Sequence, residues 1–140
     1  MFVKQLCVFI ENKSGKFQEL TNILANNGIN MTSLSLSDST AYSVARMIVS
    51  DTDKAQKALA DNGFASVTND IMAVKLNNQL GELNKLLKEL KDAKIDVQYV
   101  YALTSGKQAS ILLKTSDDKA AESIIAKNYS FYSEEEINNL

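Results

Sequence analysis

Two short turns carry the residues best suited to bind a small anion, Ser14-Gly15-Lys16 and Leu80-Gly81-Glu82. Each turn follows a segment with strand periodicity and precedes one with helical periodicity, so each is expected to open a helix. The first N–H groups of a helix lack intrahelical partners and carry the positive end of the helix dipole, and glycine lets a ligand approach the backbone closely. Each turn is therefore predicted to receive a carboxylate.

Asparagine side chains add hydrogen-bonding groups near these turns. Asn12 and Asn78 each stand three residues before the glycine, while Asn30 and Asp96 open the next predicted strands, where we expect them to lie beside the same turns. Amide groups and a carboxylate can pair with both charged groups of a free α-amino acid. The residues alone leave an alternative open, in which Asn12 and Asn78 only close Asx-turns.

Residues that could support catalysis are scarce. The sequence has no histidine, which removes the commonest general base and metal ligand, and it has one cysteine, Cys7. Cys7 stands in an alternating strand pattern and is best explained as a small buried hydrophobe. No carboxylate cluster has metal-ligand spacing, so neither enzyme activity, a metal nor a cofactor is predicted.

Composition excludes several other classes of protein. The 140 residues are 45% hydrophobic and 23% charged, and their net charge of −2 argues against a nucleic-acid partner. No apolar run approaches the roughly 20 residues needed to cross a bilayer. The N-terminus alternates like a strand and lacks the order of a secretory signal, so a cytoplasmic protein without a membrane partner is expected.

A repeat organises the chain. Residues 8–31 recur, degraded, at 74–97, and all identical pairs are separated by 66 positions. The pairs are Val8 with Val74, Asn12 with Asn78, Gly15 with Gly81, Leu20 with Leu86, Leu24 with Leu90 and Ile29 with Ile95. A fixed period of this size indicates duplication of a structural unit, and we predict two domains, 1–70 and 71–140.

The first copy is predicted to fold as βαββαβ. Its strands are expected at 3–10, 29–37, 42–49 and 64–68, its helices at 17–27 and after a cap at Asp51 or Thr52, with a hairpin turn at 38–40. Right-handed βαβ crossovers that interleave give an antiparallel sheet with both helices on one face, the ferredoxin-like plan of an α+β protein.

The second copy repeats this order from Ile71, with no linker of Gly, Pro or Ser, so the two sheets are expected side by side as one rigid body. Its first helix should bury Leu83, Leu86, Leu87 and Leu90, and its last long helix Ala120, Ala121, Ile124 and Ile125. Strands are expected from Val97, at 108–114 and at 129–132, with a turn at 105–107. Ser133 and Glu136 form a capping-box pattern that opens a terminal helix, in which Ile137 and Leu140 are expected to dock.

Both copies contain segments that resemble a known family. These segments are IENKSGKF and GINM in the first copy, and NNQLGEL and KIDV in the second. They resemble ACT domains, the amino-acid-sensing βαββαβ modules of many biosynthetic enzymes. The resemblance covers nearly the whole chain. It implies paired sheets that join edge to edge and bind an amino acid between the strand-to-helix loop of one domain and the second strand of its neighbour. The family loop usually has proline where this sequence has Ser14 and Leu80, which implies a less rigid loop.

The resemblance also assigns ligand-binding residues. Asn12 and Asn30 match asparagines that contact the ligand in serine-sensing members, with Asn78 and Asp96 as their counterparts. The implied site residues are Asn12, Lys13, Ser14, Gly15, Lys16, Asn30, Met31, Ser33, Asn78, Leu80, Gly81, Asp96, Tyr99, Val100 and Tyr101. Tyr99, Val100 and Tyr101 would face the first loop. Because Glu82 and Asp96 oppose a carboxylate whereas Lys16 favours one, the site of the first copy ranks above the second.

The sequence thus predicts a regulatory protein that senses a free amino acid, with a second copy of itself or a biosynthetic enzyme as partner. The main alternative is a ligand-free structural or regulatory subunit of an enzyme such as an acetolactate synthase, which would expose an apolar patch. RNA binding by the same topology, as in the RRM, is disfavoured because the central strands of the first copy carry aliphatic residues in an acidic protein.

Overall fold

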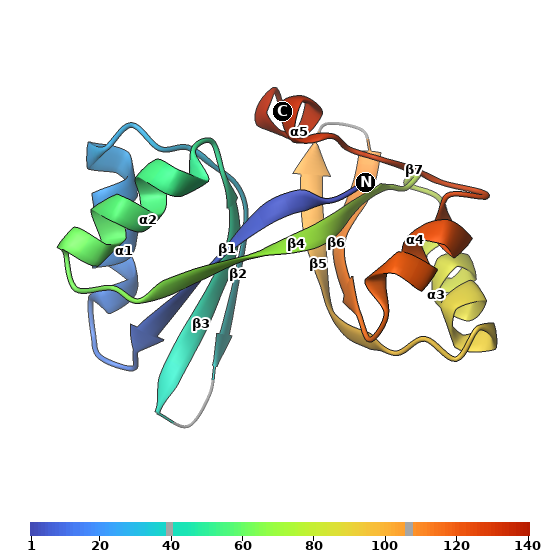
Figure 1. Cartoon of the computed structure of the whole chain (residues 1–140), viewed down its shortest axis with the longest axis horizontal. Helices are drawn as coiled ribbons and strands as arrows, with labels where there is room; N and C mark the ends of the chain where they lie inside the picture. The colour runs from blue at the N-terminus through green and yellow to red at the C-terminus, as the bar shows by residue number, and fades with distance from the viewer. Residues whose placement is uncertain (39–40, 106–107) are drawn as a thin grey trace. The chain divides into compact units, whose positions relative to one another are not determined.

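The computed structural model describes residues 1–38, 41–105 and 108–140, and the chain divides into two compact units (Figure 1). The first unit is Lys4–Asp70; the second is Ile71–Leu140 together with Met1–Val3. The predicted hairpin turns at 38–40 and 105–107 contain residues that lie outside the described part of the chain.

The first unit has the predicted order of strands and helices. Its elements are β1 (Val3–Glu11), α1 (Lys16–Asn26), β2 (Met31–Asp38), β3 (Tyr42–Val49), α2 (Thr52–Asp61) and the start of β4 (Ser66–Lys75). The strands lie in the order β2-β3-β1-β4, and β3 runs antiparallel to both of its neighbours. In the pairing of β1 with β3, Glu11 of β1 lies opposite Tyr42 of β3. This is the ferredoxin-like arrangement that the duplicated pattern predicted.

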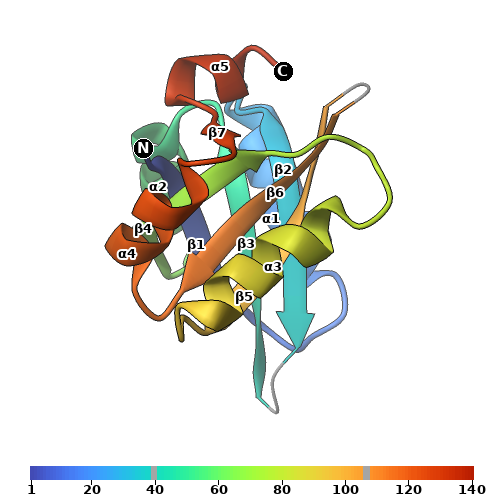
Figure 2. The ribbon, with the colours of Figure 1, turned by 90° about the vertical axis from the view of Figure 1, so that its right-hand side faces the viewer.

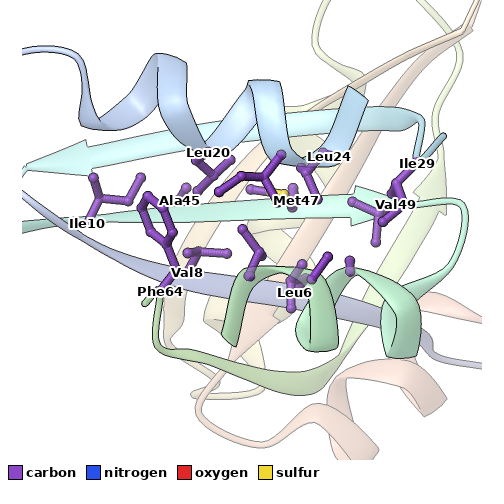
Figure 3. Packing of buried hydrophobic residues seen from close by; sticks show 14 residues of the cluster. Leu6, Val8, Ile10, Leu20, Leu24, Ile29, Ala45, Met47, Val49 and Phe64 are labelled. Atoms are coloured by element: carbon purple, nitrogen blue, oxygen red, sulfur yellow. The ribbon is translucent and has the colours of Figure 1, made fainter. Parts of the chain in front are cut away.

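One face of this sheet is covered by α1 and α2 (Figure 1). The period-two pattern of β1 turns Leu6, Val8 and Ile10 to this face, where they pack with alternate residues of β3 and the apolar stripes of both helices. Figure 3 shows Leu20 and Leu24 of α1 pointing toward the strands, into the same cluster of buried side chains. Cys7, on the opposite side of β1, is buried as predicted.

β4 differs from the prediction. We expected one strand at 64–68 and a separate strand from Ile71, but Ser66–Lys75 is a single continuous strand. Neither glycine nor proline interrupts these ten residues, so nothing in the local sequence ends the strand. Its first half belongs to the first unit and its second half to the second unit.

The second unit repeats the plan. Its elements after β4 are α3 (Glu82–Asp92), β5 (Val97–Ser105), β6 (Gln108–Thr115), α4 (Asp118–Ile125), β7 (Ser130–Phe131) and α5 (Glu134–Asn138). The strand order is β7-β4-β6-β5, and both α3 and α4 pack on one face (Figure 2). Among the described residues, no helix is long and apolar enough to cross a membrane.

Two predicted core residues of the second unit are exposed. α3 buries Leu86 and Leu90, but Leu83, in its first turn, is exposed, whereas its counterpart Phe17 packs against the core of the first unit. In the terminal helix Ile137 is buried, whereas Leu140 follows the end of α5 and remains exposed. The capping box between Ser133 and Glu136 is confirmed.

Backbone geometry confirms the duplication. Gly15 and Gly81 precede α1 and α3 with φ of 82° and 84°. After these helices Gly28 (φ 67°) and Lys94 (φ 59°) occupy the same left-handed position. Lysine is disfavoured there because its Cβ crowds the backbone, so the second copy keeps the conformation after losing the residue that suits it.

Exchanging these two residues tests that cost. Lys94→Gly should raise the free energy of unfolding by about 0.5–1 kcal/mol, because relief of left-handed strain outweighs the added freedom of glycine in the unfolded chain. Gly28→Lys should lower it by about 1 kcal/mol, since open space surrounds Gly28 and only the backbone conformation resists the side chain. Urea unfolding followed by circular dichroism measures both; shifts of the same sign would contradict the interpretation.

Candidate functional site

The turn between β1 and α1 is ordered by its own backbone. The Lys13 amide donates to the Glu11 carbonyl at 2.8 Å, and the Lys16 amide donates to the Lys13 carbonyl at 3.2 Å. Gly15, left-handed, lets the chain enter α1 directly, and no side chain caps the helix. The first-turn N–H groups of α1 are therefore not used by a capping side chain, although the Lys16 amide is bonded to the Lys13 carbonyl.

The Asn12 side chain reaches from this turn to the β2–β3 hairpin. Its Nδ2 donates to Asp38 Oδ1 at 3.3 Å, and its Oδ1 accepts from Ser43 Oγ at 2.7 Å. These contacts tie the turn to the ends of β2 and β3, and they place the Asn12 amide beside a carboxylate. Lys13 and Ser14 are exposed in the same turn.

A cavity of about 230 Å³ lies at this end of the first unit. It is bounded by the end of β1, the start of α1, the start of β3 and the turn between α2 and β4. Its lining residues are Phe9, Ile10, Glu11, Lys16, Tyr42, Gly63, Phe64 and Ala65. The Phe9 amide donates to the Ala65 carbonyl at 3.0 Å, which fixes the α2–β4 turn against β1.

Aromatic rings form much of the cavity wall. Phe9 and Tyr42 meet edge to face, with ring centroids 6.1 Å apart and an angle of 70° between the planes. Lys16 Nζ lies 5.6 Å from the centroid of the Phe64 ring, within cation–π range. The register that sets Tyr42 opposite Glu11 brings the phenol ring to the mouth of the turn.

Two opposite charges face this cavity. Glu11 is bonded to Lys13, whose hydrogen bond and positive charge hold the pKa of the Glu11 carboxyl below its usual range. Glu11 is therefore a carboxylate at neutral pH. Lys16 Nζ contacts Glu19 Oε2 at 3.3 Å, an exposed pair that costs little to separate.

The second unit has an equivalent cavity of about 210 Å³. Seven of its lining residues stand 66 positions after residues that line the first cavity, and the eighth is Asn128. The seven are Lys75, Leu76, Asn77, Glu82, Gln108, Tyr129 and Ser130. The duplication has kept the hollow and changed its chemistry. Glu82 replaces Lys16, and Lys75 replaces Phe9.

The expectation that Asn30 lies beside the same turn as Asn12 is wrong. Asn30 is bonded to Ser50, its amide to the hydroxyl at 3.0 Å and its carbonyl to the Ser50 amide at 2.9 Å. Asn12 is bonded to Ser43, and the seven residue steps from Ser43 to Ser50 span about 23 Å at roughly 3.3 Å per step. Within the unit the two asparagines stand at opposite ends of the sheet.

The second copy separates its predicted residues in the same way. Asp96 is bonded to Ser116, with the same 3.0 Å contact between amide and hydroxyl, at the start of β5. Asn78, Leu80 and Gly81 lie at the opposite end, between β4 and α3, where Leu80 is fully exposed.

The remaining predicted residues lie on strands. Met31 packs at the margin of the first core, and Ser33 is buried on β2. Tyr99, Val100 and Tyr101 lie on β5 of the second unit, partly exposed, and their expected place at the first loop stays a prediction.

Of the residues that line this cavity, the sequence analysis predicted only Lys16 as a site residue. It missed Glu11 and the aromatic residues Phe9, Tyr42 and Phe64, which were interpreted only as parts of strands. The signal that could have found Tyr42 is the β1–β3 register, which sets it opposite Glu11. Phe64 follows the turn glycine Gly63, a position that in this fold returns to the end of β1.

Among the described residues there is no group of three or more cysteine, aspartate or glutamate side chains that could hold a metal ion. Burial raises the pKa of the Cys7 thiol, an effect that the Arg46 charge and a Gln5 hydrogen bond only partly oppose. A buried thiol with a raised pKa is a poor nucleophile.

Cys7 should therefore resist thiol reagents in the native protein. With an aromatic disulfide reagent we expect reaction far slower than in denaturant, and a rate that rises at higher pH than for free cysteine. Absorbance of the released thiolate follows both. Rapid native labelling at neutral pH would contradict the inert role.

Two repeats of a ferredoxin-like βαββαβ unit, each with a hollow where its first strand turns into its first helix, define the class of this protein. A family model described as an ACT domain pair matches residues 1–140, and the chain belongs to this family. A comparison with curated proteins finds no match.

Solved structures agree with this assignment. Protein BT0572 from Bacteroides thetaiotaomicron is 32% identical, with a TM-score of 0.92 over 100% of this chain and 98% of that one. The ligand-free regulatory subunit of aspartate kinase from Thermus thermophilus is 15% identical, with a TM-score of 0.62 over 91% and 92% of the two chains. The corresponding subunit from Thermus flavus is 18% identical, with a TM-score of 0.61 over 88% of each. The last two likenesses concern the fold alone.

Proposed function

We propose that this protein is a non-enzymatic cytoplasmic regulator that binds a free amino acid at the cavity of its first unit, with residues 1–70 and 71–140 forming its two ACT domains. The observation that carries the proposal is the presence of Lys16 and Glu11 on one small cavity beside the start of α1. A zwitterion needs a cation and an anion at short range, and this cavity offers both.

The geometry suits the two charged groups of an amino acid. The ligand carboxylate would take the Lys16 ammonium and the first-turn amides after Gly15, where the helix dipole favours negative charge. The ligand ammonium would take the Glu11 carboxylate. Asn12, Lys13 and Ser14 shape the turn, whereas Asn30, at the other end of the sheet, is left out of the proposed site.

Cavity size limits the ligand. Drug-sized molecules occupy roughly 300–1,000 Å³, and the smaller hollow here accepts something of the size of one amino acid. Ligand efficiency then limits the dissociation constant to the order of micromolar to millimolar, a range that suits metabolite sensing. Binding would act by shifting a population of conformations that a partner enzyme, or a second copy of the chain, distinguishes.

The position-equivalent turn of the second unit, with Asn78, Leu80 and Gly81, is a weaker candidate. Glu82 and Asn77 stand where the first unit has Lys16 and Glu11, so the favourable pair of charges is absent from this cavity. We therefore retain the ranking of the first site above the second.

A second candidate function is a ligand-free subunit of a biosynthetic enzyme, and the edge strand of the first unit favours it. β2 has β3 as a neighbour on one side only, and it exposes Leu34 and Leu36 on one face. An exposed apolar strand edge is a surface on which another chain can pair.

A thermal-shift screen against the twenty amino acids separates the two functions. An amino acid at about 100 times its dissociation constant should add about 2.7 kcal/mol to the free energy of unfolding. Lys16→Met should lower the affinity for that amino acid by roughly tenfold or more, because a charge-assisted hydrogen bond is lost. Lys57→Met, which removes an exposed lysine of α2, is the matched control and should leave affinity unchanged.

The outcomes differ clearly. A melting temperature that no amino acid changes at millimolar concentration would reject sensing and favour the subunit. A ligand effect that survives Lys16→Met would keep sensing but remove it from the first cavity.

A further inference from the structure

We propose that the cavity of the first unit selects amino acids with an apolar side chain, in the size range from leucine to phenylalanine. This inference rests on the proposed function and names the ligand class of that same site. It follows from what lines the cavity beyond the two charges.

Three aromatic side chains, Phe9, Tyr42 and Phe64, are among the residues that line this cavity. Phe64 is 7% exposed and forms a fixed wall, while Phe9 and Tyr42, 39% and 45% exposed, leave ring surface accessible. Ile10 and Ala65 complete an apolar lining. A ligand side chain that covers the accessible ring surface removes apolar area from water, which favours apolar ligands in proportion to that area.

Polar ligand side chains find little to pair with. Apart from backbone groups, the polar atoms of the lining belong to Glu11, Lys16 and the Tyr42 hydroxyl. Glu11 and Lys16 would be occupied by the ligand's own ammonium and carboxylate. A ligand hydroxyl or carboxylate placed among the rings would lose hydrogen bonds to water without regaining them, so it would be disfavoured.

The second unit supplies an internal comparison. At the positions of Phe9, Tyr42 and Phe64 its cavity has Lys75, Gln108 and Ser130. Its wall is therefore polar where that of the first unit is aromatic.

The charges of this second wall are paired within the unit, as Glu11 and Lys16 of the first wall are paired with Lys13 and Glu19. Lys75 Nζ contacts Glu136 Oε1 at 2.7 Å and lies 4.8 Å from the centroid of the Tyr132 ring, and Glu82 contacts Lys85 at 3.0 Å. The second cavity should not take the same ligand, because Asn77 and Glu82 stand in place of Glu11 and Lys16 and its wall lacks the aromatic rings of the first. The expected stoichiometry is therefore one apolar amino acid per chain.

Titration calorimetry on the full chain tests the inference with L-leucine, L-phenylalanine, L-serine and L-aspartate as probes. Leucine or phenylalanine should bind on the order of tenfold or more tighter than serine and aspartate, because each buried methylene contributes to discrimination. Phe9→Ala and Tyr42→Ala should each lower the affinity for the apolar ligand by several-fold to tenfold, and should change the affinity for serine little. Both residues are partly exposed, so the fold should survive, and the melting temperature of the free variants checks this.

The matched control is Gln108→Ala, which alters the equivalent position of the second cavity. It should leave the affinity for the apolar ligand unchanged. Serine or aspartate binding as tightly as leucine and phenylalanine would overturn the inference and leave the proposed function standing, and so would Phe9 and Tyr42 variants with unchanged affinity. Failure of all twenty amino acids to bind would overturn the proposed function, and the inference with it.

Discussion

Coverage of one face of each sheet by two helices is the constraint on which the rest of the structure depends. A four-stranded sheet with Leu6, Val8 and Ile10 on one face is stable in water only when that face is buried, and α1 and α2 bury it. To do so, α1 must run back along β1, so the chain leaves the sheet at one end and re-enters it at the other. The turn at Gly15 and the start of β2 at Asn30 are thereby forced apart. The same packing rule that makes the fold predictable makes a site containing both Asn12 and Asn30 of one unit impossible.

Local signals in the sequence were sufficient for most of the fold. Alternation predicted β1 and β3, helical spacing predicted α1 and α2, and Asp51 caps α2 as expected, with its side chain accepting from the Lys54 amide at 3.0 Å. Local signals failed where the outcome depends on distant neighbours. Whether Leu83 is buried depends on how far the sheet extends beneath α3, and whether β4 breaks near Asp70 depends on what pairs with it. The cavity was missed for the same reason, because Phe9, Tyr42 and Phe64 are brought together by strand register and by the α2–β4 turn.

The duplication preserved backbone geometry more faithfully than chemistry. Gly15 and Gly81 share one conformation, and the amide-to-hydroxyl contact of Asn30 with Ser50 recurs at 3.0 Å between Asp96 and Ser116. Backbone positions of this kind are demanded by the fold, so substitution there costs stability in every copy. Cavity walls carry no such demand. The second hollow persists although Glu82 replaces Lys16 and Lys75 replaces Phe9, so its wall has lost one cation beside the helix start and one aromatic ring.

On the proposed function, the position of the first cavity would connect ligand binding to the strand that both units use. Its lining includes Gly63, Phe64 and Ala65, the turn that leads directly into β4 at Ser66. The Phe9 amide holds Ala65 against β1, so a ligand between Phe9, Tyr42 and Phe64 would restrict the turn from both sides. β4 is the strand that both units use, and it continues without interruption to Lys75. On the proposed function, an amino acid that orders this turn fixes the entry to the strand that both domains share. On that function, the ligand would reduce the conformational freedom of a turn that belongs to the first unit but leads directly into the strand that continues into the second.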